Sequence, residues 1–260
     1  MKKAIILFLA LSFLPIELLA WGQKGHRVIA EVAYHYMNSG ARRKVDKVLG
    51  RHGMVYWANW PDEIKSDTIY PDSFDWHFQD MPGGMTDSAI VATLTDYPAS
   101  GGSLFRVTDS LLNRLRHDRT EVDNLRFIVH FAGDRYCPMH LGHPEDYGGN
   151  RCKFSWFGQK TNIHQIWDSK LIESQGYSYT EYAAYLIDTY DYRANEVKHA
   201  TDAELLLQTY HLVEEIYAYY NHGEGDTSPY HYMYRFHQPM EWQLFVAGVR
   251  LANWMNELYK

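Results

Sequence analysis

The sequence has few of the features typical of β-sheet proteins, of membrane-spanning proteins or of proteins that bind duplex DNA nonspecifically. Strand-like alternation of apolar and polar residues is scarce along its 260 residues, so a fold based on sheets is disfavoured. Beyond the first twenty residues, no stretch approaches the roughly 18 consecutive apolar residues of a transmembrane helix. The net charge of −7 argues against nonspecific binding of duplex DNA, which relies on Lys and Arg, although metal ions can supply positive charge locally.

Cysteine is also scarce, with only Cys137 and Cys152 in the whole sequence. An exported protein can keep such a pair as a disulfide, while free thiols and zinc ligation are the alternatives. The abundant residues are histidine, with 14, and the aromatic residues tryptophan and tyrosine, with 8 and 21. Surface histidines and aromatic cores are ordinary explanations for this abundance, so the positions of these residues decide their meaning.

The first twenty residues have the layout of a secretory signal. Lys2 and Lys3 precede an apolar stretch, and the small residue Ala20 stands directly before Trp21. The apolar stretch is interrupted and short for a membrane span, which favours cleavage over a retained N-terminal anchor. We therefore expect a signal peptide over residues 1–20, a mature chain that begins at Trp21 without membrane insertion, and export to a periplasm or to the medium.

Helical periodicity is the dominant pattern in the rest of the chain. Apolar residues recur every three or four positions in the segments 25–37, 104–115, 122–136, 163–172, 179–187, 203–220 and 240–258. Helix starts are predicted at Thr120, Thr180 and Thr201, where a hydroxyl precedes acidic residues. No repeat or long linker divides the sequence, so we predict one all-α domain over residues 21–260, folded as a helical bundle.

Two pairs of histidine and aspartate indicate a metal site. His130 and Asp134 are four positions apart in an apolar segment, so they project from one face of a buried helix. Burying both polar groups is costly unless a partner satisfies them, and they could simply hydrogen-bond to one another. His164 and Asp168 repeat the same spacing on a second predicted helix, which makes that simpler explanation harder to sustain.

Further potential ligands stand in short motifs around these pairs. They are Asp62, His77 and His140, and zinc takes both of these ligand types, imidazole nitrogen and carboxylate oxygen. At the expected mature N-terminus, the α-amino group of Trp21 has a pKa of only about 8, so it could deprotonate and bind a metal together with its own carbonyl oxygen. His26 could complete that site, and the alternative is an exposed tryptophan at a frayed terminus.

In this order, the motifs resemble those of the S1/P1 nuclease family from Trp21 almost to the C-terminus. The matching segments are Trp21 with Gly25 and His26, Trp60 to Asp62, Trp76 to Phe78, His130 to His140, Gly148 to Asn150, Asn162 to Asp168 and Ala247 to Ala252. The resemblance implies a largely helical fold, shared with bacterial zinc-dependent phospholipases C, and a site for three zinc ions.

The resemblance also implies how the ligands are divided among the three zinc sites. The first site would use Asp62, His77, His130 and Asp134. The second would use His140, His164 and Asp168, and the third would use the amine and carbonyl of Trp21, His26 and Asp134. Asp134 would thus bridge two metals.

By the same resemblance, the protein would be an endonuclease that cuts single-stranded DNA and RNA to products with 5′-phosphates, with 3′-nucleotidase activity. Water held at the two sites that share Asp134 would attack phosphorus, and the other site would stabilise the departing 3′ oxygen. Asp62 would orient the attacking water as well as bind metal, and Lys65 would contact the substrate. Asp80 and Asn150 match base-binding residues of some fungal members, and no stable protein partner is implied.

Binding of a base beside the metals requires an unstacked nucleotide, which favours single strands over duplexes. The aromatic residues Tyr147, Phe154 and Trp156 stand near Asn150 and could supply a stacking surface. Packing in the core is the alternative for most of them.

The sequence departs from the family pattern at Cys137, where glutamine is usual. We predict that Cys137 forms a disulfide with Cys152, which would fasten the loop of His140 to the loop of Asn150.

Two other functions compete with the nuclease. A zinc-dependent phospholipase C could use the same scaffold, but its last ligand pair is commonly His-x-x-x-Glu, whereas this chain has His164 and Asp168. A noncatalytic, zinc-binding exported protein would need the same ligand types. That alternative does not explain why Asp62, Asp80 and Asn150 accompany the ligand set.

Overall fold

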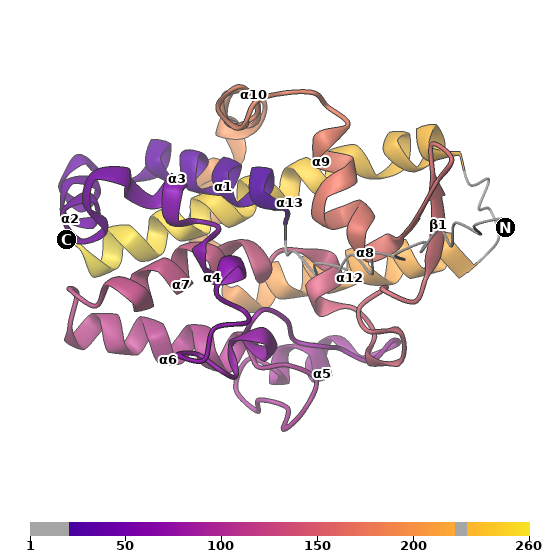
Figure 1. Ribbon diagram of the computed structural model, residues 1–260, viewed down its shortest axis with the longest axis horizontal. Coiled ribbons are helices and arrows are strands. Elements are labelled where there is room, and N and C mark those ends of the chain that lie inside the picture. The colour runs from indigo at the N-terminus through magenta and orange to yellow at the C-terminus, as the bar shows by residue number, and fades with distance from the viewer. Residues whose placement is uncertain (1–20, 222–227) are drawn as a thin grey trace, which may run out of the picture.

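The computed structural model describes residues 21–221 and 228–260, and most of them are helical (Figure 1). The predicted signal peptide, residues 1–20, lies outside the described residues. None of the helices within the described ranges has both the length and the apolar character needed to cross a membrane.

The α-helices are α1 (Gln23–Tyr36), α2 (Ser39–Leu49), α3 (Gly53–Trp57), α4 (Trp60–Glu63), α5 (Asp87–Ala92), α6 (Leu104–His117), α7 (Val122–Asp134), α8 (Ile163–Gln165), α9 (Leu171–Glu173), α10 (Tyr179–Tyr190), α11 (Ala194–His199), α12 (Asp202–Asn221) and α13 (Pro229–Leu258). Short 3₁₀ turns cover Gly50–His52, Ser73–Trp76, Pro138–Leu141, Pro144–Asp146 and Asp191–Arg193. The predicted all-α fold is confirmed.

Helix α7 lies at the centre of the bundle. It contacts α1 and α13 on one side and α6 on the other, and α3 and α4 also pack against it (Figure 1). Every residue from Phe127 to Asp134 is buried. A helix that is apolar around its whole circumference must be enclosed by other elements, and the neighbours of α7 provide that enclosure. His130 and Asp134 are therefore held deep inside the protein.

Helix α1 packs along the long helix α13, and a glycine sets their separation. A Cβ atom at Gly248 of α13 would lie 2.5 Å from Cγ1 of Val32 on α1. A side chain at this position would push the two helices apart, because that distance is shorter than any real contact. Gly248 thus keeps α1, which carries His26, close to the centre of the bundle.

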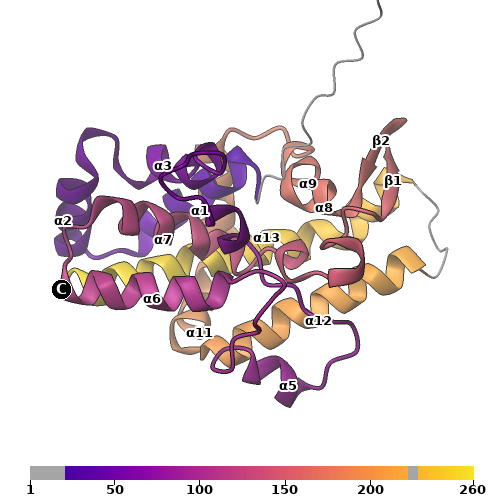
Figure 2. The same ribbon diagram turned by 60° about the horizontal axis from the view of Figure 1, so that its bottom comes forward.

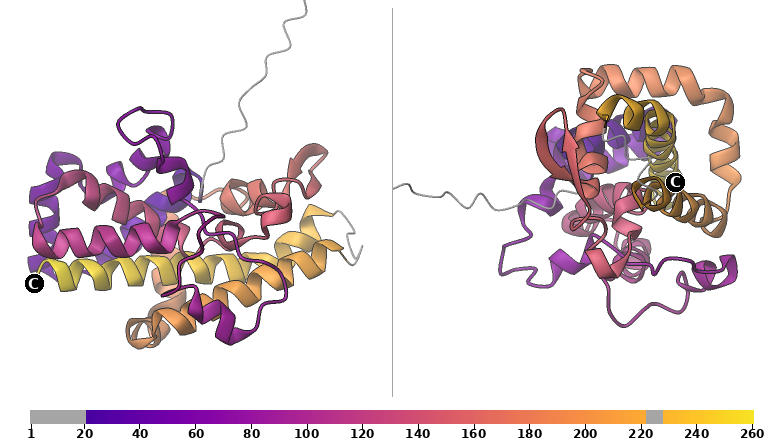
Figure 3. Two further views of the ribbon diagram at one scale, coloured as in Figure 1. Left: turned by 90° about the horizontal axis from the view of Figure 1, so that it is seen from below. Right: turned by 90° about the vertical axis from the view of Figure 1, so that its right-hand side faces the viewer.

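A short β-hairpin departs from the predicted helices and loops, and α2, α5 and α11 are helices outside the predicted segments. Strands β1 (Lys153–Trp156) and β2 (Gln159–Asn162) pair antiparallel, with Lys153 opposite Asn162. The two turn residues, Phe157 and Gly158, both have positive φ angles, of 47° and 80°. Turns with two such residues match the twist of paired strands. The hairpin lies near α8 at one end of the molecule, far from the C-terminus (Figures 2 and 3).

The helix predicted over 163–172 is present but is divided into three parts. A π-helical segment, Ile166–Lys170, separates α8 from α9 and carries Asp168. Insertions of this kind occur frequently at functional sites, because the wider turn changes the direction of the side chains. The sequence spacing alone does not show this change.

The predicted helix starts are partly confirmed. The hydroxyl of Thr201 accepts a hydrogen bond of 3.2 Å from the backbone N–H of Glu204, whose carboxylate accepts one of 2.7 Å from the N–H of Thr201. This reciprocal arrangement satisfies two free N–H groups at the start of α12. At α10 the same arrangement is made by Ser178 rather than by Thr180. Thr120 does not cap α7, so that prediction is wrong.

Candidate metal centre

The structure brings the predicted ligand side chains together from six parts of the chain. They come from α1 (His26), α4 (Asp62), the residue after the 3₁₀ turn Ser73–Trp76 (His77), α7 (His130 and Asp134), the turn Pro138–Leu141 (His140), and α8 with the following π segment (His164 and Asp168). All of these side chains are almost completely excluded from solvent. Such a concentration of imidazole and carboxylate groups in a protein core requires partners that compensate their burial.

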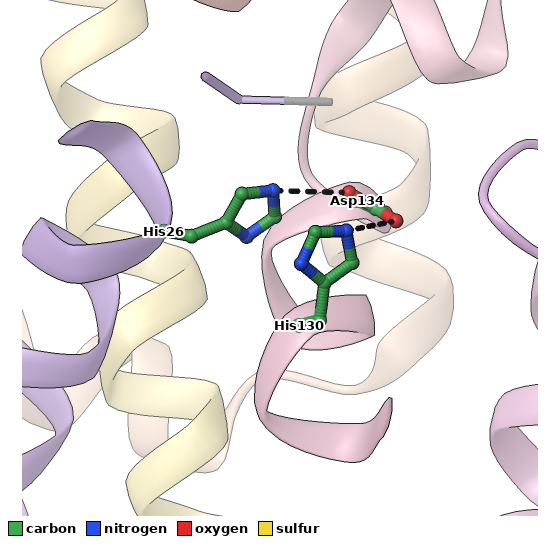
Figure 4. A group of neighbouring side chains, drawn as sticks. All are labelled: His26, His130 and Asp134. Atoms are coloured by element: carbon green, nitrogen blue, oxygen red, sulfur yellow. Dashed lines mark ion pairs between the residues drawn. The ribbon is translucent and has the colours of Figure 1, made fainter. Parts of the chain in front are cut away.

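Asp134 is the central carboxylate of this cluster. Its Oδ2 atom lies 3.0 Å from Nδ1 of His77 and 3.4 Å from Nε2 of His130. Its other oxygen, Oδ1, lies 3.5 Å from Nε2 of His26 and 3.7 Å from Nδ1 of His140. Figure 4 shows His26 and His130 approaching the two oxygens of Asp134 from α1 and α7. A carboxylate with donors at both oxygens is suited to bridge two cations.

A first group of potential ligands consists of Asp62, His77 and His130, whose donor atoms all lie within 4.8 Å of one another. Oδ1 of Asp62 is 3.5 Å from Nε2 of His130 and 3.7 Å from Nδ1 of His77. The other ring nitrogen of His130, Nδ1, is 2.6 Å from the carbonyl oxygen of Ala58. A backbone carbonyl in this position fixes the tautomer and leaves Nε2 free to bind a metal.

A second group surrounds Asp168. Its Oδ2 atom lies 3.1 Å from Nε2 of His164, and its Oδ1 atom lies 3.8 Å from Nε2 of His140. Both imidazoles again use Nδ1 for a backbone carbonyl, at 2.7 Å from Gly148 for His164 and 2.5 Å from His77 for His140. Their Nε2 atoms therefore face Asp168 in the form that binds metal.

His26 and Trp21 form the third part of the cluster. The ring of His26 stacks on that of His130 with 3.7 Å between centroids. A Cβ atom on Gly133 would lie 2.8 Å from Nδ1 of His26, so only glycine leaves room for this imidazole. Trp21 is fully buried, and its Nε1–H donates a 2.9 Å hydrogen bond to the carbonyl of Gly133. The alternative of an exposed, frayed Trp21 is therefore wrong.

The unsatisfied atoms of the cluster fit a metal site. Both ring nitrogens of His26, Oδ2 of Asp62 and Oδ1 of Asp134 are buried and make no hydrogen bond to any described residue. Leaving a buried polar atom unpaired costs about 1–3 kcal/mol, and more for a charged group. Divalent cations would satisfy these atoms together, and the nitrogen and oxygen donors match the preference of zinc.

The protonation states of the ligands are mixed. Burial would lower the pKa of His130 and His164, but the neighbouring Asp134 and Asp168 hold it above the usual range, whereas three other histidines have the neutral form that a ligand needs. Burial lowers the pKa of His26, His77 and His140 well below the usual range, so these imidazoles are neutral, as ligands must be. Burial raises the pKa of Asp134 well above its usual range. Burial would also raise the pKa of Asp62, but the neighbouring His130 and then Lys65 hold that pKa well below its usual range. Cations would favour the ionised form of both carboxylates.

A pocket opens beside the cluster and brings together the residues predicted to contact substrate. Lys65, Asp80 and Asn150 all line it, together with the ligands His77, His140 and His164. Nζ of Lys65 lies 2.6 Å from Oδ1 of Asp62. Burial, reinforced by the charge of Asp146, raises the pKa of Asp80 to about 6. The pocket therefore places three of the potential metal ligands next to side chains that can donate and accept hydrogen bonds.

The aromatic residues divide between the pocket and the core. Tyr147 lines the pocket and is 59% exposed, whereas Phe154 and Trp156 are buried and pack against Tyr232. Only Tyr147 of the three predicted candidates can stack on a ligand. Phe74, which is 43% exposed, also lines the pocket and was not predicted. Its position three residues before the predicted ligand His77 was the available signal.

The two cysteines are free thiols, so the structure does not contain the predicted disulfide. The thiol of Cys137 faces Oδ1 of Asp168 at 3.7 Å, whereas that of Cys152 donates to Oδ2 of Asp146 at 3.0 Å. Each sulfur thus faces a different carboxylate. Cys137 also belongs to a compact group with His140 and Asp168, whose donor atoms all lie within 4.8 Å of one another.

A helical scaffold that buries three such groups of histidine, carboxylate and cysteine side chains is suited to hold metal ions. Comparison with known proteins identifies its relatives: the sequence profile of the S1/P1 Nuclease family matches residues 21–260. The chain therefore belongs to the S1/P1 nuclease family, and the resemblance inferred from its motifs is confirmed.

Individual relatives agree with this assignment. The chain is 29% identical to "Nuclease P1" of Penicillium citrinum over an alignment 275 positions long, gaps included, which covers 92% of this chain and 98% of the relative. It is 29% identical to "Endonuclease 3" of Arabidopsis thaliana over 182 residues, and 28% identical to "Nuclease S1" of Aspergillus oryzae over 165 residues. These two alignments cover 67% and 62% of this chain, and they span 62% and 57% of the two relatives.

Proposed function

We propose that the protein is a zinc-dependent phosphodiesterase that cuts single-stranded DNA and RNA and leaves 5′-phosphates, with 3′-nucleotidase activity in addition. Family membership and the names of the relatives, which are nucleases and endonucleases, support this proposal. The single observation that favours it most is the position of Asp62. This buried carboxylate contacts the metal-binding histidines on one side and Lys65 at the mouth of the substrate pocket on the other.

Three zinc ions are proposed, in the sites described above. Asp62, His77, His130 and Asp134 would hold the first, and His140, His164 and Asp168 the second. His26 and Asp134 would hold the third, together with the amine and carbonyl of Trp21. Bound zinc supplies two kinds of chemistry, since it lowers the pKa of coordinated water to about 7 and neutralises negative charge that develops at phosphorus.

The amine of Trp21 becomes available only if the signal peptide is removed, so export and activity are proposed to be linked. The support is that Trp21 is fully buried beside Gly133, directly before the shared ligand Asp134. The backbone N–H of Gly22 also donates to the carbonyl oxygen of Asp168. Both contacts hold the start of the mature chain against the cluster. We propose that the mature protein acts in a periplasm or in the medium.

Asp62 would act on the attacking water as a positioned hydrogen-bond acceptor. Its carboxylate is ionised because His130 and Lys65 outweigh the effect of burial on its pKa. The ion pair with Nζ of Lys65, at 2.6 Å, restricts the rotation of both side chains. The same ammonium group lines the pocket and can approach a phosphate oxygen of the substrate.

Preference for single strands would follow from how the pocket receives a base. Asp80 and Asn150 provide hydrogen-bonding groups, and Phe74 and Tyr147 provide exposed aromatic faces on the same pocket. Reading the edge of a base while stacking on its face requires that base to leave its own stack. A duplex would have to melt locally, whereas a single strand already offers unstacked bases.

The proposal is tested by offering the zinc-loaded mature protein four substrates: single-stranded DNA, RNA, duplex DNA and phosphatidylcholine. We expect cleavage of both single strands, slow cleavage of the duplex, and 5′-phosphates on the products. Hydrolysis of phosphatidylcholine without nucleic-acid cleavage would instead identify a phospholipase C. Stoichiometric zinc binding with no hydrolysis of any substrate would identify a noncatalytic zinc protein.

A further inference from the structure

Cys137 occupies a position in the metal centre that the inferred ligand set does not use. Its side chain is fully buried at the end of α7, directly before the turn Pro138–Leu141 that carries His140. We propose that the thiolate of Cys137 is an additional ligand of the metal held by His140, His164 and Asp168. This inference rests on the proposed metal centre and adds a sulfur donor to it.

The distances fit tetrahedral coordination. Zinc binds sulfur at about 2.3 Å and carboxylate oxygen at about 2.1 Å, so two such ligands in a tetrahedral site lie about 3.6 Å apart. Sγ of Cys137 is 3.7 Å from Oδ1 of Asp168. Nε2 of His140 is 3.8 Å from the same oxygen, and the three donor atoms all lie within 4.8 Å of one another.

The local backbone keeps the sulfur in this position. The backbone N–H of Cys137 donates to the carbonyl oxygen of Asp134 at 3.2 Å, and its carbonyl oxygen accepts from the N–H of His140 at 3.0 Å. Pro138, between them, has a restricted φ angle. The main chain of Cys137 is thus held in place between two ligands, independently of any metal.

Cys152, the other cysteine, does not lie among the potential metal ligands. Its sulfur faces Asp146, next to the loop of Gly148 and Gly149, and it belongs to none of the three ligand groups found among the described residues. The two cysteines therefore provide a matched pair, one inside the metal centre and one outside it.

A thiolate ligand would change the properties of this one site. Cys137 would add a sulfur donor to the nitrogen and oxygen donors of His140, His164 and Asp168. A soft sulfur donor favours zinc over magnesium or manganese. We therefore expect this site to hold its metal more tightly and more selectively than the site at Asp62, His77 and His130, whose donors are nitrogen and oxygen alone.

Cobalt substitution tests the proposal directly, because thiolate-to-cobalt charge transfer gives a near-ultraviolet absorption band that nitrogen and oxygen ligands do not. The mature wild-type protein, loaded with Co²⁺ in place of zinc, should show this band. Cys152→Ser should keep the band at full intensity, and Cys137→Ser should lose it. A wild-type protein without the band, or loss of the band in Cys152→Ser, would overturn the proposal even if Cys137→Ser does not fold.

A measurement of zinc affinity distinguishes whether Cys137 is a metal ligand or only a hydrogen-bond donor to Asp168. Serine can still donate a hydrogen bond to Asp168 but is a poor zinc ligand, so Cys137→Ser should weaken one of the bound zinc ions by at least about tenfold in competition with a chromophoric chelator. Unchanged affinity would show that Cys137 only donates to Asp168. If the protein cleaves single-stranded DNA but shows no cobalt band, the proposed function stands and Cys137 is not a ligand. If the band is present but no cleavage occurs, Cys137 is a ligand and the proposed function is wrong.

Discussion

The indole of Trp21 donates a hydrogen bond to the carbonyl oxygen of Gly133, the residue immediately before Asp134. The two residues are 112 positions apart in sequence, and this contact is fully buried. It fastens the first residue of the expected mature chain to the helix that supplies the shared carboxylate. The position of Trp21 is therefore tied to that of the candidate metal centre.

A mature chain with one additional residue before Trp21 should lose activity. The extra residue converts the α-amino group into an amide, whose nitrogen has no lone pair available for a metal. We expect activity on single-stranded DNA to fall at least about tenfold, and the bound zinc to fall by one ion per chain. Both quantities can be measured on the two purified proteins, by gel assay and by elemental analysis.

The matched control for this experiment is Trp21→Phe in the mature chain. This variant keeps the terminal amine and carbonyl but loses the hydrogen bond to Gly133, which is worth about 1 kcal/mol of stability. It should keep the full zinc content with a slightly lower Tm. If the extended chain binds as much zinc and cleaves as fast as the mature protein, Trp21 does not bind metal.

Removal of zinc should destabilise the protein as well as inactivate it. Without cations, the unpaired atoms of His26, Asp62 and Asp134 remain buried without hydrogen bonds. Free zinc at about 1,000 times its Kd would contribute about 4 kcal/mol, which corresponds to a change in Tm on the order of 10 °C. Calorimetry before and after chelation measures the change. Zinc should restore both Tm and activity, and a Tm that is indifferent to chelation would contradict a metal role for this cluster.

Asp80 should give substrate binding a specific pH dependence. Burial and the charge of Asp146 raise the pKa of this carboxyl to about 6. Above that pH the ionised group accepts hydrogen bonds from a base, and below it the protonated group loses part of this capacity. KM for single-stranded DNA should therefore rise as the pH falls through about 6. In Asp80→Asn that inflection should be absent, and its persistence would assign it to another group.

Much of the metal centre could be predicted from the sequence because its ligands occur in short, ordered motifs. The separation of four residues between His130 and Asp134 is sufficient to place both side chains on one face of α7. The burial of that face follows from the apolar residues around it. The spacing does not predict that α1 lies close to α7, because their contact depends on Gly133 and on tertiary packing.

Other features were hidden because they depend on local backbone geometry or on chemical context. The β-hairpin is formed by two strands of only four residues, the second of which is wholly polar, and its turn uses Phe157, a residue that rarely has a positive φ angle. The spacing of apolar residues predicts a helix around Asp168 but does not distinguish a π segment from an α-helix. The role of Cys137 was misjudged because a cysteine pair in an exported chain suggests a disulfide, whereas its thiol faces Asp168.

The most direct test of the proposed function compares the mature protein with its Asp62→Asn variant on single-stranded DNA, with both proteins folded and loaded with zinc. Asparagine fills the same space but lacks the charged acceptor beside Lys65 and His130. We predict that the wild type cleaves to products with 5′-phosphates and that turnover by the variant falls by about 100-fold or more. Equal cleavage by the two proteins, or none by the wild type, would contradict the account.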